Sequence, residues 1–441
     1  MRFETDYKLE RFILETRWSD LPQAVRERLR GCMIDLTGAL VAGSQSRQFQ
    51  AGLALARRAL RSGETAVIGA RDRFDFLGAA AVMGHSSNAY DIDDGHNIIR
   101  AHPGTSFIGG LLAAGYEKGL GATDFLTALY VAYEVTIRSG AAIMDYYKFA
   151  HSSGTFGAVG VAAGAGRIFG FTKEEMNNAL SIAEFNAPLV PGIRSVEYPS
   201  MNKDGVPFGV MTGALAVLAG MSGFTGNKNL LEADEYRRYL DDLGQKHEVM
   251  QLYFKPYPCC RWAHPAIDAC LALLREHSIA PGEIEAVAIH TFQKATQLSK
   301  GVPHSADEAQ YNIAYPVASA IVNGGFSIAQ VEQTNDPAVI SMMGRLRFAC
   351  DAELDAAFPQ KRFCRAEITL KNGQTFRSAV HEPRGEAEEN IGCDWLADKF
   401  RQTTAGVLAP DAQGEIIAML RTDAWDVRAL INRLNARQPM G

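Results

Sequence analysis

The sequence predicts a mainly α-helical protein that also holds a smaller α+β segment, and two patterns along the chain carry this prediction. Up to about residue 265, apolar residues recur every three or four positions, as in LPQAVRERLRGCMIDLTGALVAG (21–43) and ATDFLTALYVAYEVTIRSGAAIM (122–144). This is the period of a helix with one buried face. From about residue 280, apolar and polar residues alternate instead, which is typical of half-buried strands. A length of 441 residues is more than one ordinary core holds, so two domains are expected.

Two of the expected helices carry glycine and alanine on every side. They are GTFGAVGVAAGAGRIFG (154–170) and GVMTGALAVLAGMSG (209–223). Small residues allow close approach between helices, so we expect both at the centre of a packed bundle. Both are short and interrupted by glycine, and no uninterrupted apolar run reaches the ~18 residues of a membrane span. We therefore expect no membrane partner.

The α+β segment is predicted to cover residues 266–390. Its expected strands are EIEAVAIHTF (283–292), GRLRFACD (344–351) and the two arms of RAEITLKNGQTFRSAVH (365–381), which are joined by an Asn372-Gly373 turn. Helical patterns lie between them, in HPAIDACLALLREH and YNIAYPVASAIVNGGF. The chain turns helical again over residues 391–441, and we expect this end to pack against the helices of residues 1–265.

Composition narrows the class of partner and the compartment. Asp and Glu (50) outnumber Lys and Arg (44), giving a formal charge of -6, whereas nucleic-acid binding needs a basic surface. Seven cysteines without repeated spacing are expected as free thiols in a reducing compartment. The N-terminus lacks a signal-peptide core. A cytoplasmic protein without a nucleic-acid partner is predicted.

One short run concentrates titratable side chains: YDIDDGHNIIRAHPG, residues 90–104, which contains Asp91 and His102. A magnesium site for diphosphate chemistry is one interpretation, but the nearest second ligand set, Asn178, Ser181 and Glu184, has the wrong spacing. A zinc site would need an HxxxH or CxxC pair, which the sequence lacks. Capping aspartates in a solvated loop are the plain structural alternative. We expect no metal.

Two further clusters and one helix start share this polar character. His151 precedes the first glycine-rich helix, where exposed backbone N–H groups would suit a ligand carboxylate. That stretch is a poor dinucleotide site, because no strand precedes it and no Walker lysine is present. Lys203 lies in SMNKDGVPFG, and Lys255, Arg261 and His264 lie in YFKPYPCCRWAHPAID. Buried cations need anionic partners, and a bound polycarboxylate would supply them.

Five motifs together carry a family resemblance. They are DIDDGHNIIRAHPG, HSSGTFGAVGVAAGAGRIFG, SMNKDGVPFGVMTGALAVLAGMSGFTG, FKPYPCCRWAHPAID and AQYNIAYPVASAIVNGGF. In this order they resemble the MmgE/PrpD family of 2-methylcitrate dehydratases, cis-aconitate decarboxylases and iminodisuccinate epimerases. The resemblance implies an all-helical main domain from residues 1–265 plus 391–441, an inserted α+β lid domain over 266–390, a homodimer, and cofactor-free chemistry on a polycarboxylate in a cleft between the domains.

The resemblance also selects site residues. It picks out Asp91, His102, His151 and Tyr315 for catalysis. The histidines would exchange a proton near neutral pH, Asp91 would tune a histidine, and Tyr315 would donate a proton or hydrogen bond to the leaving oxygen or to a carboxylate.

Substrate binding is assigned to a set of residues that would bind carboxylates. The set is Lys203, Lys255, Arg261 and His264, of which the resemblance itself selects the two lysines.

The sequence leaves three reactions open, in a ranked order. Dehydration of a citrate-like hydroxy acid by α-proton abstraction comes first, followed by epimerisation of a dicarboxylate such as iminodisuccinate, and then by cis-aconitate-type decarboxylation. A protein that binds a dicarboxylate without catalysis is the alternative from a different class.

Overall fold

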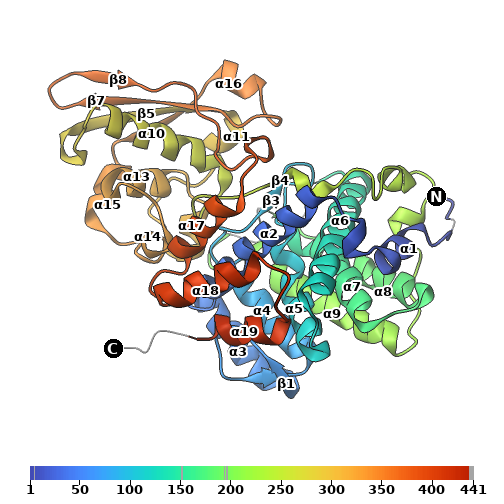
Figure 1. Cartoon of the computed structure of the whole chain (residues 1–441). Coiled ribbons are helices and arrows are strands. Elements are labelled where there is room, and N and C mark those ends of the chain that lie inside the picture. The colour runs from blue at the N-terminus through green and yellow to red at the C-terminus, as the bar shows by residue number, and fades with distance from the viewer. Residues whose placement is uncertain (4, 150–151, 193, 195–196, 437–441) are drawn as a thin grey trace.

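The computed structural model describes the chain except for residues 4, 150–151, 193, 195–196 and 437–441. The prediction of a mainly α protein is confirmed (Figure 1). The first half contains the helices α1 Lys8–Glu15, α2 Gln23–Gly43, α3 Arg47–Ala59, α4 Phe76–Ser87, α5 Thr105–Lys118, α6 Ala122–Tyr147, α7 Ser153–Phe169, α8 Lys173–Asn186 and α9 Val206–Met221.

This helical part also contains two small antiparallel strand pairs, which differ from the expected all-helical arrangement. β1 (Ser62–Ala66) pairs with β2 (Arg73–Phe74), and β3 (Gly95–His96) pairs with β4 (Leu252–Tyr253). The strands are too short for an alternating pattern to appear in the sequence. The second pair matters for the site, because it ties the loop after α4 to a segment more than 150 residues later in the chain.

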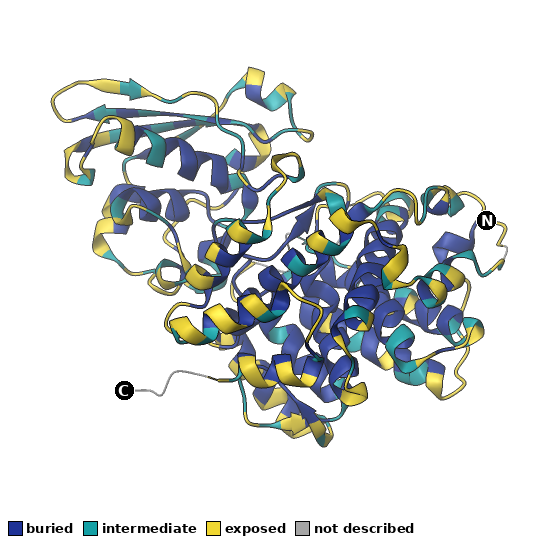
Figure 2. Cartoon of the chain, in the orientation of Figure 1, coloured by how far each residue is buried: buried dark blue, intermediate teal, exposed yellow. Residues whose placement is uncertain are grey.

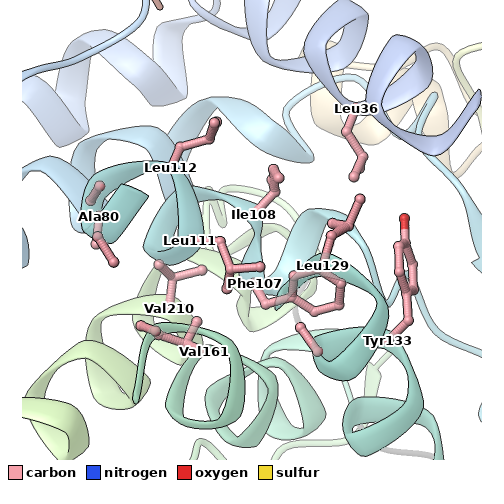
Figure 3. Close-up of a cluster of buried hydrophobic side chains, with 14 of the residues drawn as sticks. Leu36, Ala80, Phe107, Ile108, Leu111, Leu112, Leu129, Tyr133, Val161 and Val210 are labelled. Atoms are coloured by element: carbon pink, nitrogen blue, oxygen red, sulfur yellow. The ribbon is translucent and has the colours of Figure 1, made fainter. Parts of the chain in front are cut away.

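The glycine-rich helices lie at the centre of the helical part, as their composition predicts. A Cβ atom on Gly157 of α7 would lie 2.3 Å from the carbonyl oxygen of Ser106 in α5, and one on Gly209 of α9 would lie 2.3 Å from that of Gly154 in α7. Backbones this close leave no room for larger residues. Figure 3 shows the apolar side chains that fill the remaining space, among them Leu36, Phe107, Leu111, Val161 and Val210.

The second half begins with α10 His264–Glu276 and contains a four-stranded sheet of order β6-β5-β7-β8. The strands are β5 Ile284–Thr291, β6 Leu346–Cys350, β7 Cys364–Leu370 and β8 Thr375–Arg377. β5 runs parallel to β6 and antiparallel to β7, and β7 and β8 form the predicted hairpin. Gly373 in the turn has φ 88°, a value that favours glycine. The helices between the strands are α11 Gln293–Thr296, α12 Ala306–Gln310, α13 Ala314–Asn323, α14 Ile328–Glu332, α15 Pro337–Met343 and α16 Ala352–Ala356.

Three C-terminal helices return to the first half: α17 Cys393–Thr403, α18 Pro410–Leu420 and α19 Val427–Leu434. α17 packs against α2, with Leu396 beside Gly31 and Phe400 beside Gly38. The buried hydrophobic residues form two clusters, one joining residues 9–254 with 396–434 and one drawn mainly from residues 257–370. Figure 2 shows both as dark blue interiors beneath exposed turns. The assignment of residues 266–390 as a lid stays a prediction, because these clusters report packing and not movement.

One segment differs from the expectation that the apolar helices are too short for a membrane. The 3-10 turn Lys203–Gly205 runs directly into α9, so residues 203–221 reach the length and the mean hydropathy, 1.4, of a membrane span. A core helix of a soluble protein meets the same test, and 56% of the most apolar window of this segment is buried.

Candidate active site

The run of titratable residues between α4 and α5 folds into a tight loop. Asp91 has φ 50°, in the left-handed region that Asp tolerates better than most residues. The side-chain amide of Asn88 donates to Asp93 Oδ1 at 2.8 Å, and the backbone N–H of Gly104 donates to Asp94 Oδ1 at 3.0 Å. Asp91, Asp93 and Asp94 are all buried, so these aspartates are not the solvated helix caps of the plain structural alternative.

His102 lies among three acceptors supplied by this loop. Its Nε2 lies 3.2 Å from Asp91 Oδ1, and its Nδ1 lies 3.1 Å from Asp93 Oδ2 and 2.9 Å from the carbonyl oxygen of Asp94. Nδ1 is within hydrogen-bonding distance of the Asp94 carbonyl oxygen, and a carboxylate lies beside each ring nitrogen, an environment that favours the imidazolium form. Burial lowers the pKa of His102, but the carboxylates of Asp93 and Asp91 outweigh it and raise the pKa to about 10.

Asp91 joins this histidine to a buried lysine. Lys255 Nζ lies 2.6 Å from Asp91 Oδ2, and both side chains are 1% exposed. Burial alone would raise the pKa of Asp91, yet the charges of Lys255, His102 and Lys203 hold it well below the usual range. Asp91 also accepts a hydrogen bond of 3.3 Å from the hydroxyl of Tyr311. It is therefore the ionised centre of the cluster.

Lys203 reaches the same place from the turn before α9. Its Nζ donates to Gln310 Oε1 and lies 5.1 Å from the centre of the Tyr311 ring. Burial lowers the pKa of Lys203. The left-handed φ values of Asp204 (52°) and Gly205 (66°) turn the chain here, so that the lysine faces the cluster while the next residues begin α9.

The start of α7 contributes a hydroxyl. Ser153 Oγ accepts the backbone N–H of His102 at 2.9 Å and donates to Asp204 Oδ2. Burial raises the pKa of Asp204. The loop of His102, the start of α7 and the turn of Lys203 are thus linked by hydrogen bonds. His151, which the sequence places just before α7, lies outside the described residues.

Three of the predicted site residues have their polar groups engaged elsewhere. Arg261 forms an ion pair with Glu386, and its Nη1 donates to Asn97 Oδ1 at 3.0 Å. His264 Nε2 lies 3.0 Å from the carbonyl oxygen of Cys259, and burial holds its pKa well below the usual value. The hydroxyl of Tyr315 donates to two backbone carbonyls at the C-terminal end of α14, those of residues 330 and 333, at 2.7 and 2.8 Å. None of these hydrogen bonds and ion pairs involves Asp91 or His102.

The structure therefore brings Asp91, His102, Lys203 and Lys255 together and adds residues to which the sequence analysis assigned no role. The additions are Asp93, Ser153, Asp204, Gln310 and Tyr311. Tyr311 lies four residues before Tyr315 in the same motif, AQYNIAYPVA, and it is the tyrosine of this motif whose hydroxyl contacts Asp91; the catalytic role of Tyr315 stays a prediction.

A second set of buried polar residues contacts the loop of His102. Asp94 Oδ2 accepts the hydroxyl of Tyr133, and burial together with the charge of Asp35 raises the pKa of Asp94 to about 7. Lys399 of α17 pairs with Asp35 and donates to the carbonyl oxygen of Ile92 at 2.5 Å. Within the described ranges, no group of three or more His, Cys, Asp or Glu side chains is arranged to hold a metal ion.

Comparison with known proteins covers nearly the whole chain. Residues 7–246 match the MmgE/PrpD N-terminal domain, and residues 257–424 match the MmgE/PrpD C-terminal domain. A cis-aconitate decarboxylase-like protein, oryM, of Aspergillus oryzae is 23% identical over 90% of this chain and 90% of its own. The cis-aconitate decarboxylase of Homo sapiens is 22% identical over 95% and 92%, and that of Aspergillus terreus is 22% identical over 94% and 93%.

Proposed function

The chain belongs to the MmgE/PrpD family, and from this premise we propose that it is a lyase acting on a small polycarboxylate. The leading reaction is decarboxylation of an unsaturated tricarboxylate of the cis-aconitate type. The observation that carries this choice is the position of His102, whose two ring nitrogens face only acceptors. A histidine held as imidazolium acts as a proton donor and not as a base.

Decarboxylation uses such a donor directly. The bond between carbon and an allylic carboxylate breaks, the carboxylate leaves as carbon dioxide, and the electron pair of that bond forms a new alkene. The electron pair of the former alkene then takes a proton from His102, which becomes neutral. No electrons leave or enter the site overall, so the step requires no redox cofactor. The names of the curated relatives, cis-aconitate decarboxylases, support the same reaction.

The lysines would hold the substrate. Lys255 pairs with Asp91, and Tyr311 contacts both Asp91 and Lys203, so the two lysines lie around the same carboxylate. Ammonium groups in a water-poor site bind carboxylates strongly, and they stabilise negative charge as it develops on the reacting carbon. Because Lys255 already has Asp91 as its partner, Lys203 is the cation with more freedom to take up a substrate carboxylate.

Dehydration, the first choice from sequence, stays as the second candidate because one observation favours it. Burial lowers the pKa of Lys203, and a lysine with a lowered pKa can act as a base. It would remove the α proton of a citrate-like hydroxy acid while His102 protonates the departing hydroxyl. Epimerisation would use the same abstraction, but it needs a second donor on the opposite face.

The deciding experiment is proton NMR of the purified protein in D₂O with EDTA, offered cis-aconitate, citrate, 2-methylcitrate and iminodisuccinate separately. We expect cis-aconitate to give a dicarboxylate with two new alkene signals and one deuterium in its methylene group. A new alkene from a hydroxy acid would move dehydration to first place. Exchange of an α proton without an alkene would establish the epimerase. No change with any of the four acids would contradict the proposed lyase.

His102→Gln is the matched variant, because glutamine keeps a polar group but cannot deliver a proton. Loss of a general acid typically costs about 100- to 10,000-fold in rate. Tyr315→Phe serves as the control, since the hydroxyl of Tyr315 donates to two backbone carbonyls and not to Asp91 or His102. A His102→Gln enzyme within about threefold of the parent would remove His102 from the mechanism.

A further inference from the structure

We infer that Arg362, assisted by Arg100, binds a third carboxylate of the substrate and so makes the site selective for tricarboxylates over dicarboxylates. This inference deepens the proposed function and rests on it. Arg362 was not among the residues selected from the sequence. It lies two residues before β7, in the second half of the chain, whereas the loop of His102 lies in the first half.

Burial without a partner is the first observation. The side chain of Arg362 is 7% exposed, yet none of the described residues forms a hydrogen bond or ion pair with its guanidinium. The nearby carboxylate of Glu382 is paired with Lys361 at 2.8 Å. A guanidinium stays charged in proteins, and a buried unpaired charge is costly. An anionic ligand would remove that cost.

The position of the segment is the second observation. The ring of Phe358 packs against those of Trp262 and Phe292, at 6.0 and 4.7 Å between centroids. The hydroxyl of Thr291 donates to the carbonyl oxygen of Phe363 at 2.9 Å. These contacts hold residues 358–363 beside the turn that contains Cys260 and Trp262.

That turn faces the loop of His102. The backbone N–H of Cys260 donates to the carbonyl oxygen of Gln310, whose side chain binds Lys203. Burial raises the pKa of the Cys260 thiol to about 11. The charge of Asp91 acts on this thiol in the same direction, and those of Lys255 and Arg362 act against it. Cys260 therefore lies within electrostatic reach of both the Asp91 cluster and Arg362.

Arg100 is the second cation. It is exposed, has φ 51°, and has no carboxylate partner among the residues that the structure describes. It lies two residues before His102. Burial lowers the pKa of Arg362, and the like charge of Arg100 acts in the same direction, so the two guanidiniums repel each other. The one carboxylate that acts on Arg362, that of Glu382, is paired with Lys361, so an anion between the two guanidiniums would stabilise them.

The cations fall into two sets. Lys203 and Lys255 act on Asp91, whereas Arg100 and Arg362 act on each other. A dicarboxylate would be served by the lysines alone, whereas a third carboxylate would find its partners at the arginines.

The test is calorimetric titration with two unreactive acids that differ by one carboxyl group, propane-1,2,3-tricarboxylate and 2-methylbutanedioate. Arg362→Ala should weaken binding of the tricarboxylate about 10- to 100-fold and that of the dicarboxylate less than about threefold. Arg365→Ala is the control, because Arg365 lies on the same segment but pairs with Asp351 and Glu353 at the surface. It should change neither constant.

A second variant keeps the inference testable if Arg362→Ala does not fold. Arg362→Lys retains the charge but not the planar fork, so it should weaken tricarboxylate binding less than alanine does and leave dicarboxylate binding unchanged. Equal losses for both acids, or no loss for either, would overturn the inference while leaving the lyase intact. A parent protein that binds neither acid would overturn the proposed function and the inference together, a result that needs no variant.

Discussion

Replacing Asp93 by asparagine should move the pH dependence of the reaction, because Asp93 is the carboxylate that does most to raise the pKa of His102. The substitution removes a charge 3.1 Å from Nδ1 and keeps an oxygen that can accept from Asn88. In the parent, activity that depends on protonated His102 should be constant through neutral pH and fall as pH rises through about 10.

The magnitude follows from the distance. One opposite charge within hydrogen-bonding range typically changes a pKa by about 1 to 3, so the alkaline limb of Asp93→Asn should lie between about pH 7 and 9. Each pH unit corresponds to about 1.4 kcal/mol of lost preference for the imidazolium. Because the folded pKa of His102 lies above the ordinary value of 6.5, its contribution to stability is complete below that pH and is lost as pH rises through about 10.

The assay is kcat/KM across pH with the acid that the parent converts, together with thermal unfolding over the same range. Asp411→Asn, at an exposed position of α18, is the matched control and should leave both curves unchanged. A parent limb near pH 6.5, or an Asp93→Asn limb within about 0.3 of the parent, would refute the assignment of His102 as a charged proton donor.

Three further outcomes are expected. Tyr311→Phe should lower kcat about tenfold or more, because the hydroxyl of Tyr311 contacts Asp91. Tyr315→Phe should instead lower the free energy of unfolding by about 1 to 3 kcal/mol with little change in kcat. If kinetics and urea unfolding showed the reverse pattern, the roles of the two tyrosines would be exchanged. Lys399→Met should cost about 3 to 5 kcal/mol in urea unfolding, since it leaves Asp35 buried without its cation, and an unchanged midpoint would show that the pair is not coupled. Gly104→Ala should abolish activity or folding, because its Cβ would lie 2.3 Å from Asp94 Oδ2 and 2.4 Å from the hydroxyl of Tyr133; a fully active variant with the parent's Tm would contradict this packing.

The sequence predicted the elements with strong periodicity and missed those defined by few residues. The buried glycine-rich helices and the Asn372-Gly373 hairpin depend on local pattern, so they could be recognised directly. The pairing of β3 with β4 joins residues far apart in the chain through only two register pairs, and no local pattern reports such a contact.

The same division applies to the site. Asp91 and His102 share one run, so their contact could be expected. Which of Tyr311 and Tyr315 contacts Asp91 could not be predicted from the sequence, because it depends on the residue at which α13 begins. Asn312 Oδ1 accepts the backbone N–H of Tyr315 at 2.8 Å, and the helix then directs the Tyr315 hydroxyl toward the backbone carbonyls of residues 330 and 333. The family motif identifies the segment, but it does not determine the direction in which each tyrosine hydroxyl points.

The bond from Lys399 to the carbonyl oxygen of Ile92 has a consequence for biosynthesis. Ile92 lies between Asp91 and Asp93, so the loop of His102 is anchored by a residue synthesised some 300 positions later. Until α17 has emerged from the ribosome, Asp35 lacks its cation and this loop lacks its anchor. A nascent chain stalled before α17 should therefore remain without a functional site, and chaperones and proteases of the cell should bind it.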